Sequence, residues 1–355
     1  MLSARGSPRV TSDEPPNPRA RIDLKLCPMG VRIGTSGWNY PGGKGTWNGV
    51  FYPKPRPKGF DELSYYAEHF ETVEVNTTFY GQPRADVCRT WAQKTPPGFD
   101  FSLKLYQKFT HPAMYRERVA QGVPRDVQQT PDMAAAIAAL AKTNAADLDE
   151  FRRGIDPLAT AGKLGALLAQ FPASFKSGRS SQDYLAELLR AFSGYPIAVE
   201  LRHRSWSDHL VETLALLNEF GAAWAQIDEP KFRFSIRQNH LPNIKGFYYM
   251  RLHGRNAAHW WRHEKAEDRY DYLYSAAEIK EFAETAVAVD RIVRKAYVYT
   301  NNHYSARSVA NAAMLKIELG EPLEGEYTPE FLERYPELKD AMDTSVTRKR
   351  LASRE

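Results

Sequence analysis

The stretch Ile197-Ala-Val-Glu-Leu-Arg202 shows the pattern that decides the fold, a short apolar run that ends in charged side chains. Seven other runs of this kind occur along the chain, and helix-like stretches follow them. They are VRIGTSG (31–37), TVEVN (72–76), FDFSLK (99–104), GALLAQF (165–171), AAWAQID (222–228), FYYMRLHG (247–254) and AYVYTNN (296–302). Near-continuous apolar strands that alternate with helices are typical of parallel strands buried on both faces. Eight such units predict an α/β fold, a single closed TIM-like (β/α)8 barrel with a parallel sheet and an active site where the strands end.

The length and composition of the chain fit one such barrel with insertions. Its 355 residues are 43% hydrophobic, and a barrel of this kind takes about 250 residues. The polar, proline-rich segment 1–29 is expected to be a disordered leader, and residues 30–320 to form the barrel domain. Residues 321–355 predict a short helix at 329–338 followed by a basic tail.

Helices are predicted between most strands, and two connections are long. Ser205-Trp-Ser-Asp208 has the form of a capping box and is expected to open a helix that runs to Phe220. The other predicted helices lie at 60–70, 85–94, 148–158, 182–192, 276–289 and 309–317. The connections 106–147 and 254–275 are long, which is typical of functional or lid-like loops.

The charge and the cysteine content exclude several classes of protein. A formal net charge of +5 is too small and too dispersed to favour nucleic-acid binding, although the basic Arg348-Lys-Arg350 tail keeps it as an alternative. Two cysteines form neither a disulfide framework nor a four-cysteine metal site, and they suggest a reducing compartment. The sequence contains no run of 18 apolar residues, so no membrane span is predicted. The N-terminus lacks the apolar core of a signal peptide. We therefore expect a cytoplasmic protein that does not bind membranes.

Polar side chains at the strand ends can be assigned to the barrel interior, because side chains alternate faces along a strand. The residues predicted to face inward are Glu74, Asn76, Ser102, Lys104, Gln170, Glu200, Arg202, Gln226, Asp228, Arg251, His253 and one of Asn301 and Asn302. Branched apolar side chains normally fill barrel interiors, and buried ion pairs are often replaceable by apolar residues without loss of stability. Six charges at one end of the barrel therefore favour a functional site over a purely structural ion network.

The balance of these charges indicates the kind of ligand. Glu74, Glu200 and Asp228 face Lys104, Arg202 and Arg251, so the set is neutral, whereas a hard-cation site requires a net negative oxygen cage. A metal site made of the three carboxylates and His253 remains an alternative. Arginine and lysine beside carboxylates fit an anionic ligand better, with the carboxylates available for proton transfer.

Two further features lie at or just beyond the predicted strand ends. The aromatic residues just beyond the strand ends, Trp38, Tyr80, Tyr106 and Trp206, could stack on a ligand ring or could simply pack. Ser36 lies in Gly34-Thr-Ser-Gly37-Trp38, which lacks the second glycine of a nucleophile elbow, so a turn is the better interpretation. No nucleotide-binding glycine motif is present, and no cofactor is expected.

Several of these segments together resemble the YecE-like family (domain of unknown function 72), over about Val31 to Gly320. The matching segments are Gly34–Trp38, Phe51–Pro53, Thr72–Tyr80, Lys104 with Thr110-His111, Gln170–Pro172, Ala198–Arg202 with Trp206, Arg251–Gly254 and Asn301-Asn302. The resemblance implies a TIM-like barrel and supplies no reaction. The chain departs from the family pattern in a longer insertion at about 112–146, next to His111.

These observations lead to a hypothesis of an enzyme, an isomerase, lyase or hydrolase, that acts on a small polar anionic metabolite, sugar-like or phosphorylated. The candidate catalytic residues are Glu74, Glu200, Asp228 and His253. The candidate ligand-binding residues are Asn76, Lys104, His111, Gln170, Arg202, Trp206, Arg251, Asn301 and Asn302. A non-catalytic ligand sensor or partner-binding barrel is the alternative, and no metal is expected under the leading hypothesis.

Overall fold

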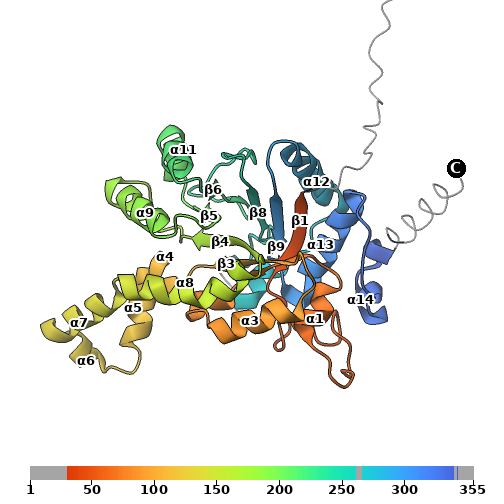
Figure 1. Cartoon of the computed structure of the whole chain (residues 1–355), viewed down its shortest axis with the longest axis horizontal. Coiled ribbons are helices and arrows are strands. Elements are labelled where there is room, and N and C mark those ends of the chain that lie inside the picture. Colours follow the sequence, from red (N-terminus) through yellow and green to blue (C-terminus); the bar gives the residue numbers. More distant parts are fainter. Residues whose placement is uncertain (1–29, 261–265, 340–341, 343–355) are drawn as a thin grey trace, which may run out of the picture.

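A computed structural model describes residues 30–260, 266–339 and Met342. The predicted leader at 1–29 and the basic Arg348-Lys349-Arg350 tail lie outside these residues. Nine strands form one sheet in which every pairing is parallel. The strands are β1 (Val31–Ser36), β2 (Thr72–Val75), β3 (Asp100–Lys104), β4 (Leu164–Gln170), β5 (Ile197–Glu200), β6 (Ala223–Trp224), β7 (Gln226–Asp228), β8 (Tyr248–Leu252) and β9 (Ala296–Thr300). This sheet curves into a nearly closed barrel (Figure 1) and confirms the predicted TIM-like class.

The barrel closes along a seam at one interrupted strand. The run predicted as a single strand at 222–228 is divided at Ala225 into β6, which pairs with β5, and β7, which pairs with β8. Side-chain amides complete the backbone hydrogen bonds there. Asn243 Oδ1 accepts from the Trp224 amide at 2.7 Å, and Gln238 bonds both the Ile227 amide (3.0 Å) and the Ala225 carbonyl (2.9 Å).

Helices surround the barrel, and most of them bury apolar residues. They are α1 (Glu62–Ala67), α2 (Thr77–Tyr80), α3 (Ala85–Lys94), α4 (Gln107–Thr110), α5 (Pro112–Ala120), α6 (Arg125–Gln128), α7 (Pro131–Ala141), α8 (Ala145–Thr160), α9 (Arg179–Ala191), α10 (Ser205–Asp208), α11 (Leu210–Glu219), α12 (Ala276–Asp290), α13 (Arg307–Glu318) and α14 (Pro329–Arg334). Short 3-10 helices occupy Ala266–Tyr270 and Tyr304–Ala306. None of the helices in the described part of the chain is long and apolar enough to span a membrane.

Three helix expectations were wrong. Residues 229–247, after β7, contain no helix, and the prolines and asparagines of this segment favour turns. Ser205 does not cap a helix, because its hydroxyl accepts from the Ser177 amide and lies 2.9 Å from His203 Nδ1. The predicted helix at 329–338 is broken at Tyr335, since the following Pro336 restricts the backbone of the residue before it.

Tyrosines fill the lower barrel interior where branched aliphatic residues are usual. Tyr297 and Tyr299 stack with ring centroids 6.0 Å apart, and Tyr249 lies 5.2 Å from Tyr299. Their hydroxyls reach polar groups on other strands, including Asp100 from Tyr297 (3.1 Å) and Glu74 from Tyr249 (2.7 Å). The hydroxyls of Tyr249, Tyr297 and Tyr299 are therefore all hydrogen-bonded, as buried polar groups require.

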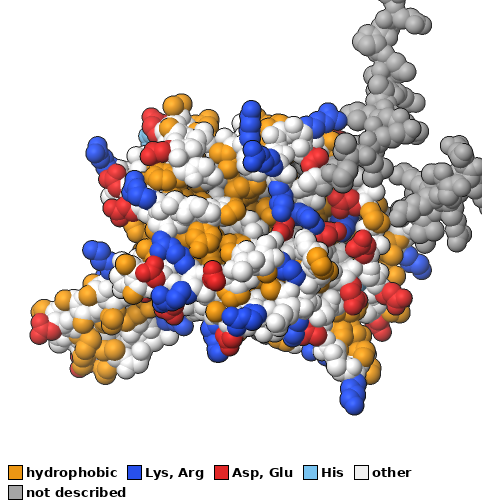
Figure 2. Space-filling model, in the orientation of Figure 1, with side chains coloured by type: hydrophobic (Ala, Val, Ile, Leu, Met, Phe, Trp, Pro, Cys, Tyr) orange, Lys and Arg blue, Asp and Glu red, His pale blue; other side chains and the backbone are white. Residues whose placement is uncertain are grey.

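The long connection 106–147 is helical rather than loop-like. It forms α4 to α7, and the segment with α5, α6 and α7 projects from the barrel as an arm (Figure 1). Hydrophobic side chains show on the surface of the arm (Figure 2), and Leu140, near the end of α7, is 59% exposed.

Candidate functional site

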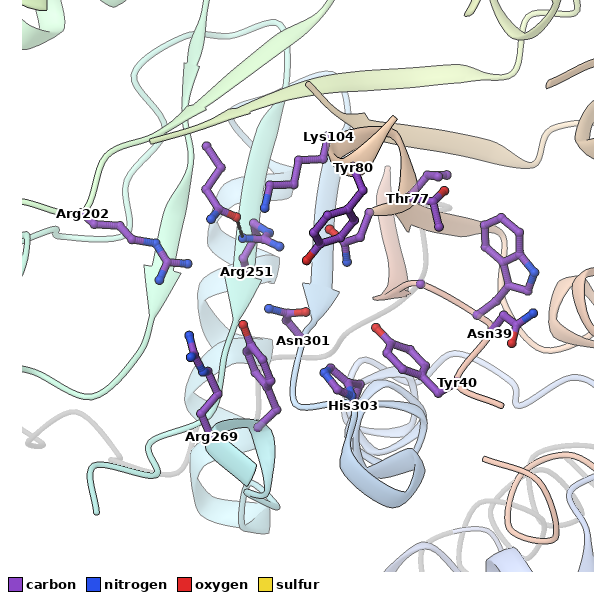
Figure 3. A pocket seen from close by; sticks show the side chains of 16 residues that line it. Asn39, Tyr40, Thr77, Tyr80, Lys104, Arg202, Arg251, Arg269, Asn301 and His303 are labelled. Atoms are coloured by element: carbon purple, nitrogen blue, oxygen red, sulfur yellow. Dashed lines mark hydrogen bonds between the residues drawn. The ribbon is translucent and has the colours of Figure 1, made fainter. Parts of the chain in front are cut away.

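A cavity of about 370 Å³ opens at the C-terminal ends of the strands, and side chains from several strands meet there (Figure 3). Its side chains are mainly cationic, amide or aromatic. The cationic residues are Lys104, Arg202, Arg251 and Arg269. The amides are Asn39, Asn76, Gln170 and Asn301, and the rings are Trp38, Tyr40, Tyr80, Tyr270 and His303. No aspartate or glutamate is among the described residues that line this cavity.

Arg251 lies at the base of the cavity and is held by two carboxylates. Its Nε and Nη2 donate to Glu74 at 2.8 and 2.6 Å, and its Nη1 donates to Glu200 Oε2 at 2.5 Å. Glu74 also accepts from Ser36 Oγ and Tyr249 OH, both at 2.7 Å. Gln170 Oε1 accepts from Arg251 Nη1 at 3.0 Å. Four donors saturate Glu74, so its carboxylate fixes the position of Arg251 and has little capacity left for a ligand.

Arg202 extends the network toward the cavity mouth. Its Nε donates to Glu200 Oε1 at 2.6 Å, and its Nη1 lies 3.1 Å from Glu229 Oε2. Burial alone would raise the pKa of Glu200, but the charges of Arg202 and Arg251 outweigh it and hold that pKa well below its ordinary value. Burial raises the pKa of Glu229, although Arg202 acts against this. Glu200 is thus a fixed anion between two arginines.

His253 is neutral in this arrangement, and its tautomer follows from its neighbours. Nε2 faces Arg202 Nη2 at 3.2 Å and Arg251 Nη1 at 3.3 Å, and both guanidinium groups can only donate. Nε2 is therefore the acceptor and Nδ1 carries the proton. Asn301 Nδ2, itself a donor, lies 2.8 Å from Nδ1, so this tautomer requires the Asn301 amide to be turned so that its oxygen faces Nδ1. Burial and then the charges of Arg251 and Arg202 lower the pKa of His253 to about 3.

Lys104 has fewer charged partners than Arg202 and Arg251. Its side chain is half-buried and its Nζ lies 3.9 Å from the centre of the Phe79 ring. Among the ion pairs of the described residues, none includes Lys104. Burial and the charge of Arg251, together with Arg202 and against Glu200 and Glu74, lower the pKa of Lys104 to about 7.

Aromatic side chains form part of the wall across the cavity from Lys104, on the side where Arg269 also lies. Tyr40 and His303 stack with centroids 4.2 Å apart and planes 10° apart, and Tyr270 lies 4.8 Å from His303. Burial lowers the pKa of His303 to about 3, so this ring is neutral. Figure 3 shows Tyr40, Asn301 and His303 across the cavity from Lys104. Such a wall can contact the apolar face of a ring or of a sugar.

The structure brings many of the predicted residues together. Glu74, Glu200, Arg251 and His253 form the buried network, and Asn76, Lys104, Gln170, Arg202 and Asn301 line the cavity with Arg251. Asn301 and Asn302 divide as expected. Asn301 faces the cavity, whereas Asn302 donates to the Tyr272 carbonyl (2.7 Å) and to Asn311 (2.8 Å).

Three further predicted residues also lie away from the cavity. Asp228 accepts from Arg255 (2.9 Å) and Tyr274 (2.7 Å), which connect it to α12 rather than to the cavity. Gln226 donates to the Trp224 carbonyl at the seam. Trp206 is fully buried, stacks on Phe175 and donates to its carbonyl.

His111 also does not line the cavity. Its ring packs against Phe79 in a T-shaped arrangement. The same Phe79 ring also contacts Lys104 Nζ. Burial and then the charges of Lys104 and Arg202 lower the pKa of His111 to about 3. The insertion 106–147 supplies no lining residue, whereas the connection 254–275 supplies Arg269 and Tyr270.

Some residues of the site were missed by sequence reasoning. They are Asn39, Tyr40, Thr77, Glu229, Arg269, Tyr270 and His303. All follow the strands in irregular segments or short helical turns, where side-chain direction has no fixed period. The single available signal was the length of the 254–275 connection.

The arrangement does not match the metal alternative. Within the described ranges, no group of three or more histidine, cysteine, aspartate or glutamate side chains is placed to hold a metal ion. Glu74 and Glu200 direct their oxygens at arginines, and Asp228 lies in a separate network.

Comparison with known proteins defines the family. A model of the DUF72 family, proteins of unknown function, matches residues 32–333, so the chain belongs to this family. The UPF0759 protein YunF of Bacillus subtilis (strain 168) is 23% identical over 296 residues, which are 80% of this chain and 93% of YunF. The UPF0759 protein YecE of Escherichia coli (strain K12) is 37% identical over 65 residues, 18% of this chain and 24% of YecE.

Solved structures agree with this assignment. The DUF72 family protein TM1631 of Thermotoga maritima MSB8 is 33% identical, with a TM-score of 0.65 over 82% of this chain and 99% of that protein. The DUF72 family protein EF0366 of Enterococcus faecalis V583 has a TM-score of 0.65 at 24% identity, over 84% of this chain and 99% of that protein, and shares the fold.

Proposed function

We propose that this barrel is an enzyme that binds a small polar anionic metabolite, sugar-like or phosphorylated, at the cavity and acts on it by acid–base chemistry. The observation that supports this most is the lining itself, which holds four cationic side chains and no described carboxylate. A surface of this kind attracts anions, and the surrounding amides can bond hydroxyl groups. The scarcity of cysteine suggests that the reaction takes place in the cytoplasm.

The roles divide between groups that contact the ligand and groups that hold them. Arg202 and Lys104 contact the anion, with Asn76, Gln170 and Asn301 orienting the rest of the molecule. Glu74, Glu200 and His253 position the two arginines, since their own polar atoms are already bonded within the network. Lys104 is the ionisable group of the cavity with a pKa, about 7, that suits proton transfer at neutral pH.

Thermal denaturation with added anions tests the binding step. Inorganic phosphate, sugar phosphates and small carboxylates should raise the melting temperature, because a ligand at 100 times its Kd stabilises the folded state by about 2.7 kcal/mol. Lys104→Met should remove most of this response. Lys280→Met, at an exposed position on α12, is the matched control and should respond as the wild type does. If no anion shifts the wild type, or if Lys104→Met responds equally, the proposal fails.

Catalysis is tested on the anions that bind. Each is incubated with the protein and followed by NMR for exchange of carbon-bound hydrogen with deuterium oxide or for formation of product. Turnover that disappears in Lys104→Met supports an enzyme. Tight binding of an anion that the wild type never alters would instead support the ligand-sensor alternative.

A further inference from the structure

Lys104 differs in its contacts from the two arginines beside it. Arg251 is paired with Glu74 and Glu200, and Arg202 with Glu200 and Glu229. Lys104 has no carboxylate within ion-pair distance among the described residues. Its ammonium group makes a cation–π contact with Phe79, with Nζ 3.9 Å from the centre of the ring. Lysines held by carboxylates remain ammonium ions, so the absence of such a partner at this position favours an amine that can react.

Lys104 shares the cavity with two arginines that can attract a negatively charged ligand. Lys104 enters the cavity from the end of β3, and Arg202 and Arg251 enter from β5 and β8. In Figure 3 Lys104 and Arg251 are directed into the same part of the cavity. An anionic group near Arg202 would place the remainder of a small ligand within the reach of Nζ, with Tyr80 close by.

We propose that Nζ of Lys104 is a nucleophile that forms a Schiff base with a small carbonyl compound bearing a carboxylate or phosphate group. This inference rests on the proposed function, because it assumes that an anion enters the cavity, and it assigns the substrate class. Keto acids and phosphorylated keto sugars share the required chemistry, a carbonyl carbon within a few bonds of an anionic group.

The step balances without an external reagent. The lone pair of the neutral amine attacks the carbonyl carbon, and the carbon–oxygen π electrons move to oxygen, which takes one proton from nitrogen. The carbinolamine then loses its oxygen with both amine protons as one water molecule, leaving a carbon–nitrogen double bond. Protonation of this imine from solvent gives an iminium ion, which stabilises negative charge on the neighbouring carbon.

The lowered pKa of Lys104 agrees with a role as nucleophile. With a pKa of about 7, about half of the Lys104 side chains are neutral at pH 7, whereas an ordinary lysine with a pKa near 10.4 is neutral in about one molecule in 2,500. Burial and neighbouring cations are recognised ways to activate a lysine nucleophile.

Reductive trapping tests the proposal. The protein is incubated with pyruvate or with dihydroxyacetone phosphate and sodium cyanoborohydride, and the adducts are located by peptide mass spectrometry. We expect one adduct per chain, at Lys104, forming at least about tenfold faster than at exposed Lys280 and faster at pH 8 than at pH 6. The two probes separate carboxylate from phosphate ligands, and acetone, which has no charge, should react more slowly.

Two variants serve as controls. Lys104→Arg keeps a cation but lacks a reactive amine, so it should lose the adduct. Lys163 is buried but donates to the Ala92 and Thr95 carbonyls and to Thr95 Oγ1, so it should stay unmodified in the wild type. Lys163→Arg should therefore form the Lys104 adduct as the wild type does.

The outcomes distinguish this inference from the proposed function. Adducts spread over exposed lysines, or unchanged in Lys104→Arg, overturn the Schiff base. An anion-dependent rise in melting temperature without any trapped adduct overturns the Schiff base and leaves the proposed function standing. If neither is seen, both proposals fail.

Discussion

His253 shows how strongly one buried side chain depends on its charged surroundings. Two guanidinium groups face its Nε2 and only 1% of the residue is exposed. Its pKa falls to about 3 through burial and the charges of Arg251 and Arg202, against about 6.5 in an unfolded chain. The unfolded chain therefore binds a proton between these values that the folded chain does not, so stability is complete above about pH 6.5 and falls as the pH drops toward 3.

This difference predicts a measurable effect of pH on stability. Between about pH 7.5 and 5.5, His253 alone should cost the wild type about 1.4 kcal/mol of unfolding free energy. His253→Gln keeps an acceptor for the arginines but cannot bind the proton. Over the same pH interval its unfolding free energy should therefore fall by about 1.4 kcal/mol less than that of the wild type. Urea titrations at the two pH values give the comparison, and His209→Gln, at an exposed position, controls for the substitution itself. An equal pH effect in wild type and His253→Gln would contradict the assignment.

The individual site residues differ in how far sequence could place them. Alternation along β2, β5 and β8 correctly predicted that Glu74, Glu200 and Arg251 would meet, because these strands are regular. The same argument misplaced Asp228, because the strand is interrupted at Ala225 and the alternation does not carry across the break. Trp206 follows a strand in the sequence. It lies in the short helix α10, and its side chain is buried in the core.

At the level of elements, the packing of α8 depends on the absence of one side chain. Gly154 is buried in the middle of this helix, and a Cβ there would lie 2.1 Å from the carbonyl oxygen of Pro83. The helix therefore approaches the segment before α3 more closely than an alanine would permit.

This close approach reverses the usual effect of replacing a helical glycine. In an exposed helix, Gly→Ala stabilises by about 1 kcal/mol, but overpacking at a buried contact costs about 1–3 kcal/mol. Gly154→Ala should therefore lower the unfolding free energy in urea denaturation. Arg153→Ala, on the exposed side of the same turn, should have little effect. A Gly154→Ala protein more stable than the wild type would show that α8 can shift away at little cost.

At the level of the whole molecule, the seam at Ala225 determines whether the barrel is closed. β6 pairs only with β5 and β7 only with β8, so side-chain amides complete the hydrogen bonds between them. The positions of the strands could be predicted from eight apolar runs, since each run is buried on both faces, although one run forms both β6 and β7. The seam could not, because Gln238 and Asn243 lie in an irregular segment whose path depends on the finished barrel.

Loss of these amides should weaken the closure. Gln238→Ala leaves the Ile227 amide and the Ala225 carbonyl without their partner, and an unsatisfied buried group costs about 1–3 kcal/mol. We expect a comparable fall in unfolding free energy and faster hydrogen exchange of the Ile227 amide by NMR. Asn239→Ala, on an exposed part of the same segment, is the control. Unchanged exchange at Ile227 would mean that water replaces the amide without cost.

The half-ionised state of Lys104 couples the cavity to the acidity of its surroundings. At pH 7 about half of the molecules carry the ammonium form, and an anion that settles beside this side chain favours that form. Under the proposed function, each binding event then draws a fraction of a proton from the buffer, and a more alkaline medium weakens binding. Occupancy of the cavity would thus vary with the pH of the surroundings, and the two buried arginines, whose charge is fixed, would supply the part of the attraction that pH does not alter.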